Sequence, residues 1–218
     1  MRTRASLLAG LLTILFLAPS LAGQGQQRGR RLFPPEELGE LEGPDRDAWQ
    51  KPDLIMDALR IGEGALVADV GAGGGWFTVR LARRVGPNGR VYAQDLQPQM
   101  LEAIRRRIDR EGFRNVQYVR GEAADPRLPD HALDAVLLVD TYHEIANPVP
   151  LLRHLGESLK PAGRIGIVNF TREGGGPGPP MNQRVDAQRV IDEARQAGLR
   201  LLSRETFLDF EYMLVFGN

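Results

Sequence analysis

The chain has 218 residues, of which 42% are hydrophobic and 26% charged, and this is enough apolar material for one core of ordinary domain size. Its 28 basic and 28 acidic residues give a formal net charge of zero, so no overall field draws it to nucleic acid or to an anionic membrane. Because cysteine is absent, disulfides, thiolate nucleophiles, cysteine-based metal sites and a lipoprotein anchor are excluded.

Residues 1–22 have the three parts of a secretory signal peptide. Two arginines precede the apolar stretch 7–18, and small residues up to Ala22 provide a cleavage site. We expect export, to the periplasm or the exterior. The alternative is an uncleaved membrane anchor with the domain facing the cytoplasm, because arginines at 28, 30 and 31 follow the apolar stretch and positive charge tends to stay on that side.

Residues 23–46 are rich in Gly, Gln, Arg, Pro and Glu, which predicts a flexible tether before a folded domain at residues 47–218. The domain begins with an apolar pattern around Leu54 and Ile55 that predicts a helix, with Pro52 in its first turn. Trp49, just before it, either packs in the core or caps a ligand pocket.

The rest of the domain alternates strand-like and helix-like segments, which is typical of a parallel sheet covered by helices on both faces. Strands are expected near residues 66–70, 90–94, 116–120, 135–139, 164–169, 199–207 and 212–216, and helices near 74–85, 98–111, 148–159 and 186–197. The short turn after Phe207 indicates a terminal antiparallel hairpin. The predicted fold is therefore α/β, a Rossmann-like seven-stranded and mostly parallel sheet.

A glycine cluster separates the first strand from the next helix, in the sequence Asp69-Val70-Gly71-Ala72-Gly73-Gly74-Gly75-Trp76. Glycine permits positive φ and a close approach of the backbone to a ligand, and the following helix directs free N–H groups toward it. A dinucleotide-binding motif wants a small residue where Trp76 stands. About two dozen residues later Asp95 ends the second strand, where a carboxylate can accept hydrogen bonds from both hydroxyls of a ribose.

An acid followed by this G-x-G-x-G spacing resembles motif I of the class I S-adenosylmethionine-dependent methyltransferases. The resemblance covers about residues 47–218 and implies methyl transfer with S-adenosyl-L-methionine as cofactor. It implies cofactor contacts at the ends of the first two strands, from Asp69, Gly71, Gly73, Gly75, Asp95 and Leu96. After the third strand, Glu122 holds the place of the acid that reaches the adenine in this family, and the backbone N–H of Ala123 is the alternative contact.

The fourth strand leads into Asp140-Thr141-Tyr142-His143-Glu144, similar to the segment of small-molecule methyltransferases that faces the cofactor's methionine part and the acceptor. Methyl transfer depends mainly on holding the acceptor close and aligned. If the acceptor must lose a proton, His143 is the candidate base, because imidazole titrates near neutral pH. Asp140 either orients that ring or binds the cofactor's amino group, and Tyr142 is expected to pack against the cofactor. The alternative is that His143 only closes the strand.

The expected partner is a small or lipophilic acceptor, by similarity to quinone-biosynthesis methyltransferases, with no nucleic acid and no metal. Arg105 to Arg107 are interpreted as a solvated helix face paired with Glu102 rather than an RNA-binding patch. The Gly- and Pro-rich residues 171–180 form either a mobile lid over the acceptor or a plain flexible loop. Two other functions stay open: a non-catalytic module that keeps the fold, and an NAD-binding oxidoreductase.

Overall fold

The computed structural model describes residues 32–41 and 43–218, so the expected signal peptide or anchor lies outside the described residues. In this part of the chain, no helix has the length and apolar character needed to cross a bilayer. The same residues form one sheet, with the strands β1 (Leu66–Val70), β2 (Arg90–Asp95), β3 (Val116–Arg120), β4 (Leu133–Val139), β5 (Leu159–Phe170), β6 (Arg200–Glu205) and β7 (Glu211–Gly217).

The strand order is β3-β2-β1-β4-β5-β7-β6, and β7 runs antiparallel to both of its neighbours. The predicted mostly parallel sheet with a terminal antiparallel hairpin is confirmed. The α-helices are α1 (Arg46–Gln50), α2 (Pro52–Ala58), α3 (Trp76–Val85), α4 (Pro98–Glu111), α5 (Pro148–Ser158) and α6 (Ala187–Gln196). Short 3-10 helices are η1 (Pro35–Leu41), η2 (Tyr142–Glu144) and η3 (Met181–Gln183).

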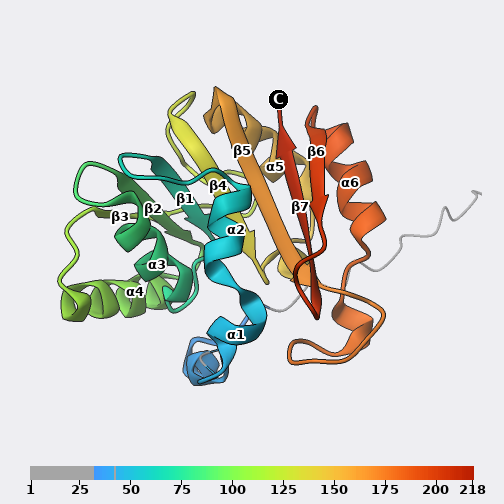
Figure 1. The fold of residues 1–218 in the computed structure, drawn as a ribbon, viewed down its shortest axis with the longest axis horizontal. Coiled ribbons are helices and arrows are strands. Elements are labelled where there is room, and N and C mark those ends of the chain that lie inside the picture. The colour runs from blue at the N-terminus through green and yellow to red at the C-terminus, as the bar shows by residue number, and fades with distance from the viewer. Residues whose placement is uncertain (1–31, 42) are drawn as a thin grey trace, which may run out of the picture.

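The sheet is covered on both faces, which explains why its central strands are apolar throughout. In β4, Ala135 and Leu137 pack with α2 and α3, while Val136 and Leu138 pack with α5 and α6 on the other face. All four side chains are almost completely buried. Figure 1 shows α2, α3 and α4 in front of the sheet and α5 and α6 behind it.

Two local differences from the sequence prediction have clear physical causes. The helix expected near the domain start is split into α1 and α2 at Lys51, which has φ 48°. The following Pro52 disfavours the helical conformation at the residue before it and has no N–H to donate. Strand β5 begins at Leu159 because Leu159 already pairs with Leu133, before a shift in register brings Arg164 opposite Ala135.

Within residues 23–46, which composition predicts to be a tether, the described part contains η1 at Pro35–Leu41, and Arg46 begins α1. The carboxyl ends of β1 to β5 point to one edge of the sheet, at the bottom of Figure 1, where η1, α1 and the loop after β5 also lie. Open α/β sheets bind their ligands at this edge.

Candidate cofactor and acceptor site

The glycine loop joins β1 to α3 and is fixed to the end of β2. Gly71, Gly73 and Gly75 have φ of 69°, 55° and 79°, in the left-handed region that glycine tolerates best. The N–H groups of Gly71 and Ala72 donate to the carbonyl of Gln94 at 2.9 and 3.0 Å. The N–H of Gly73 donates to Oδ2 of Asp95 at 3.0 Å. The glycine loop therefore follows β1 directly and is hydrogen-bonded to the end of β2.

Gly71 and Gly73 are glycines for different reasons. A Cβ at Gly71 would lie 2.3 Å from Cγ2 of Thr141, whose hydroxyl donates to the Gly71 carbonyl at 3.2 Å. A Cβ at Gly73 would meet nothing within 4 Å. The backbone at Gly73 thus borders open space, as a loop that receives a ligand must, while Gly71 packs against the turn after β4.

Asp69, next to the end of β1, is 3% exposed, and its Oδ2 accepts a hydrogen bond of 2.6 Å from the hydroxyl of Thr78 in α3. Burial raises the pKa of Asp69 to about 6, and the hydrogen bond from Thr78 opposes that shift. The carboxyl group holds the start of α3 against the strand.

Asp95 ends β2 and is 7% exposed. Besides Gly73, its carboxylate accepts a hydrogen bond of 2.9 Å from the N–H of Gln97. Burial raises the pKa of Asp95, and bonds from backbone N–H groups, that of Leu96 among them, oppose the rise. Since each carboxylate oxygen has two lone pairs, acceptor capacity remains for ligand hydroxyls.

Asp140 follows β4 in a left-handed conformation, with φ 54°, and its N–H donates to the carbonyl of Val168 at 3.0 Å. Its Oδ2 accepts a hydrogen bond of 3.2 Å from the side-chain amide of Gln50 and lies 3.6 Å from the guanidinium of Arg46. Its Oδ1 is buried and has no hydrogen-bond partner among the described residues. A ligand amino group is a suitable donor to that oxygen, so the site fits a cofactor with an amino-acid end.

Three polar residues that the sequence pattern did not indicate surround Asp140. The amide of Gln50 in α1 also donates to both oxygens of Glu211, the first residue of β7, at 2.9 and 3.1 Å. The guanidinium of Arg46 lies 4.3 Å from the centre of the Trp76 ring, at the start of α3. Burial is the main cause of a pKa of Glu211 well above its usual range, and neighbouring Asp140 raises it further. The available sequence signal for this group was Glu211, an acid at the start of the apolar strand β7.

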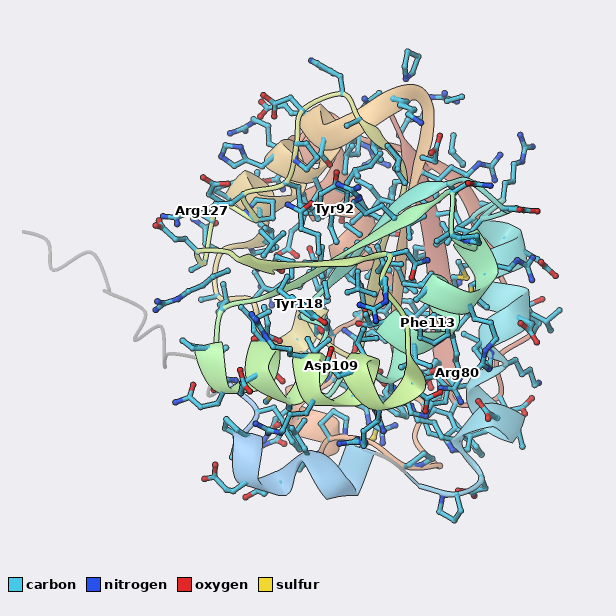
Figure 2. The ribbon with its side chains drawn as sticks, turned by 90° about the vertical axis from the view of Figure 1, so that its left-hand side faces the viewer. Arg80, Tyr92, Asp109, Phe113, Tyr118 and Arg127 are labelled. Carbon is cyan, nitrogen blue, oxygen red and sulfur yellow. The ribbon has the colours of Figure 1, made fainter. Side chains whose placement is uncertain are left out.

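The segment before α1 reaches the same edge. The N–H of Phe33 donates to Oε2 of Glu144 at 3.1 Å, and the amide of Gln97 donates to the carbonyl of Phe33 at 2.9 Å. Phe33 therefore bridges the residues that follow β4 and β2. Figure 2 shows η1 running beside α4, and Leu38 of η1 and Ala103 of α4 line one hollow. Burial raises the pKa of Glu144 to about 7, although the bond from Phe33 opposes it.

Two residues of the turn after β4 are placed differently from each other. Tyr142 is 1% exposed in the core beside α5 and α6, and its hydroxyl donates to Oε2 of Glu193 at 2.7 Å. Its ring has no open face, so the expected contact with the cofactor is wrong for this structure. The short helix η2 directs Tyr142 inward because the apolar face of α6 receives the ring. His143 lies in the same helix and is partly buried, close to the edge that carries Asp140.

The turn after β3 begins beside the end of β2, because the N–H of Gly121 donates to the carbonyl of Asp95 at 3.2 Å. Its N–H and carbonyl groups close a tight turn between Glu122 and Asp125. The Glu122 carboxylate is exposed and forms an ion pair with Arg127, which lies at the periphery of the molecule in Figure 2. Ala123 is also exposed. The Glu122 side chain is thus exposed to solvent, whereas Asp69 and Asp95 are buried.

The Gly- and Pro-rich loop after β5 is fixed by one buried arginine. The guanidinium of Arg184 donates to the carbonyls of Thr171, Gly175, Pro177 and Pro179. Gly176 and Gly178 lie so close to Phe210 and Phe170 that a Cβ would come within 2.3 and 2.5 Å of their rings. Trp49 packs on the same two rings, with centroids 5.9 and 6.5 Å away. In this structure Trp49 is a packing aromatic beside the loop after β5.

The sheet order and the glycine loop between two strand-end acids define a Rossmann-like cofactor-binding domain. Residues 67–163 match the family model described as a methyltransferase domain. A protein-L-isoaspartate O-methyltransferase of Methanothrix thermoacetophila is 30% identical over 148 residues, which are 63% of this chain and 68% of that protein. The chain belongs to the class I S-adenosylmethionine-dependent methyltransferases and is an enzyme that uses S-adenosyl-L-methionine.

Further matches come from another curated protein and from solved structures. The ubiquinone/menaquinone biosynthesis C-methyltransferase UbiE of Pasteurella multocida is 30% identical over 57% of this chain and 46% of its own length, so the chain spans about half of that relative. A SAM-dependent methyltransferase of Aquifex aeolicus superposes with a TM-score of 0.80 at 27% identity, over 84% of this chain and 98% of that one. The [4+2]-cyclase SpnF, 23% identical with a TM-score of 0.63 over 72% of this chain and 59% of that one, shares the fold.

Proposed function

We propose that this methyltransferase transfers its methyl group to a small, lipophilic acceptor bound between Asp140, α1 and the loop after β5. The cofactor lies over the glycine loop, its ribose hydroxyls on Asp95 and its amino group on Oδ1 of Asp140. Its adenine extends past Leu96 toward the turn at Glu122 and Ala123. The observation that carries this arrangement is that Asp69, Asp95 and Asp140 stand at or near the ends of three adjacent strands around the open backbone of Gly73.

Cofactor placement is tested by calorimetric titration with S-adenosylhomocysteine. Asp95→Ala removes the acceptor for two hydroxyls, and a hydrogen bond to a charged group contributes about 1.5–3 kcal/mol, so affinity should fall at least about tenfold. Asp192→Ala, an acid on the exposed face of α6, is the matched control and should bind like the wild type. Equal affinities of the Asp95 variant and the wild type would refute this placement.

The acceptor class is supported by the aromatic side chains beside Asp140. Trp49 and Phe210 are partly exposed there and pack on the buried ring of Phe170, and flat lipophilic molecules pack well on the exposed part of such rings. The quinone-pathway names of several relatives agree with this class. The test is transfer of a labelled methyl group from S-adenosylmethionine to small aromatic compounds in a lipid extract. Labelling of isoaspartyl peptides instead would overturn the proposal, and labelling of neither would favour a non-catalytic module.

We further propose that His143 accepts the acceptor's proton where the acceptor enters protonated. Its place in η2, three residues after Asp140 at the strand-end edge, supports this role. His143→Ala should lower the rate of transfer and remove the acidic limb of its pH profile, while leaving S-adenosylhomocysteine affinity within about twofold. An unchanged pH profile would leave His143 as the residue that closes β4.

Export of the mature enzyme is also a proposal, supported only by the sequence pattern of residues 1–22. Blotting of fractionated cells distinguishes a shortened chain outside the cytoplasm from a full-length chain in the membrane fraction. The second result would favour the anchor.

A further inference from the structure

A hollow of about 150 Å³ lies between α4 and η1, and three arginines line it. Its residues from α4 are spaced i, i+3, i+4 and i+7, which places them on one stripe of the helix. They are Ala103, Arg106, Arg107 and Arg110. Leu38 of η1 and Gly74 of the glycine loop complete the lining. The volume is several times the about 30 Å³ that one water molecule occupies in the liquid, so the hollow has room for a small ligand.

Two acids of α4 lie toward β3 rather than toward η1. Glu102 is shared between Arg105 and Arg106, at 3.8 and 3.5 Å. Arg105 lies 4.8 Å from the centre of the Tyr118 ring in β3. Burial raises the pKa of Tyr118, and nearby Asp109 raises it further, so Asp109 is on the same side. Figure 2 shows Tyr118 above α4 and η1 below it. The stripe that faces η1 is therefore mainly basic.

The other described groups around the hollow leave this positive charge in place. Arg110 is exposed and has no ion pair within the described part of the chain. Glu36 and Glu37 of η1 are exposed as well. Because side chains three residues apart eclipse each other in a 3-10 helix, neither of these two acids shares the face of Leu38. An anion that enters the hollow thus meets guanidinium groups first.

We propose that the hollow between α4 and η1 is an effector site for a small, soluble molecule that carries a phosphate group. Guanidinium groups donate paired hydrogen bonds to carboxylate and phosphate oxygens. Several of them around one hollow favour the anion of higher charge, and a phosphate group carries about −1.5 to −2 at pH 7, whereas a carboxylate carries one charge. A lipid headgroup offers the same phosphate, but exposed Glu36 and Glu37 beside the hollow repel an anionic membrane surface.

The hollow is linked to the cofactor site through the glycine loop. Nη1 of Arg107 donates to the carbonyl of Gly74 at 3.1 Å. A Cβ at Gly75 would lie 3.2 Å from Cγ2 of Ile104, so α4 also packs closely on the loop. A phosphate bound to Arg107 restricts that side chain and the loop backbone that it holds. The cofactor then loses less conformational entropy on binding and binds more tightly. This coupling rests on the proposed function, which places the cofactor over the glycine loop.

The first measurement is calorimetric titration of the full chain with inorganic phosphate, at constant ionic strength because salt alone screens exposed charges. The wild type should bind phosphate saturably. Arg106→Gln and Arg110→Gln should each weaken binding by about two- to fivefold, and the double variant by about fourfold or more. Arg105→Gln is the matched control. It removes the same charge from the neighbouring position of α4, on the side of Tyr118, and should bind phosphate like the wild type.

The second measurement is titration with S-adenosylhomocysteine, with and without saturating phosphate. Affinity should rise about fivefold with phosphate in the wild type and in Arg105→Gln, and should not change in the double variant. The inference is overturned if the wild type does not bind phosphate saturably, if the double variant binds it equally well, or if phosphate leaves the S-adenosylhomocysteine affinity of the wild type unchanged.

A vesicle assay distinguishes the two sources of phosphate. The wild type should not sediment with phosphatidylcholine vesicles that contain phosphatidic acid. Sedimentation that is lost in the double variant would assign the arginines to a membrane surface and overturn the soluble ligand. Failure of S-adenosylhomocysteine to bind with and without phosphate would refute the proposed function instead, because phosphate binding is measured in the absence of the cofactor.

Discussion

Alanine at Gly71 and at Gly73 separates the structural from the ligand-binding role of the glycine loop. Both residues have positive φ, 69° and 55°, so both substitutions carry the backbone cost of a left-handed non-glycine residue, about 1–2 kcal/mol. The two positions differ in how much room there is for a Cβ. The new Cβ lies 2.3 Å from Thr141 at Gly71 and meets nothing within 4 Å at Gly73.

The clash at Gly71 adds an overpacking cost of about 1–3 kcal/mol. We therefore expect Gly71→Ala to lower the free energy of unfolding by about 2–5 kcal/mol, and Gly73→Ala by about 1–2 kcal/mol. Relative to the stability that each variant loses, the loss of cofactor affinity should be larger for Gly73→Ala than for Gly71→Ala. The methyl group at Gly73 enters the space where a ligand approaches the backbone, and affinity should fall at least about tenfold.

Urea denaturation followed by circular dichroism gives the stabilities, and calorimetric titration with S-adenosylhomocysteine gives the affinities. Each variant serves as the control of the other, because loop, residue type and sign of φ are shared. Equal losses of stability would show that the Thr141 contact does not constrain Gly71. Wild-type affinity in Gly73→Ala would show that the open space there is not the ligand's.

Three further predictions concern the segments around the site. Burial raises the pKa of Glu144 from 4.5 to about 7, so its protonation stabilises the fold at low pH and this contribution is lost as pH rises through 7. Glu144→Gln should therefore remove up to about 3 kcal/mol of the decline in unfolding free energy between about pH 5 and 8. Parallel pH profiles of stability for the variant and the wild type would contradict this. A chain that starts at Gly43 lacks the Phe33 bridge between Glu144 and Gln97 and should bind S-adenosylhomocysteine several-fold more weakly in calorimetry; unchanged affinity would show that the bridge does not shape the site. Arg184→Lys replaces a branched donor group by a single ammonium, and should speed amide hydrogen exchange in residues 171–180 without changing exchange in β4. Equal exchange in the variant and the wild type would mean that the glycine and proline contacts alone hold the loop.

Some differences between prediction and structure arise from contacts between distant segments. The pattern around Pro35 to Leu41 is polar and lacks apolar periodicity, yet the nearby Phe33 backbone finds partners on Glu144 and Gln97. Composition describes a segment by itself and contains no information about side chains more than sixty residues away. The same reasoning applies to Arg184, whose hydrogen bonds order a loop that its glycines and prolines leave without helix or strand.

The sequence by itself determined the sheet, the glycine loop and the strand-end positions of Asp69, Asp95 and Asp140. These follow from local rules, because strand and helix periodicity, glycine at positive φ and parallel connections are properties of short stretches of chain. Only the tertiary structure decided that Gln50 gathers Asp140 and Glu211 and that Arg46 stacks on Trp76. It also turned Tyr142 into the core. The physical reason is that burial and charge pairing depend on which surfaces meet, and that is settled when α1, β4 and β7 converge at one edge.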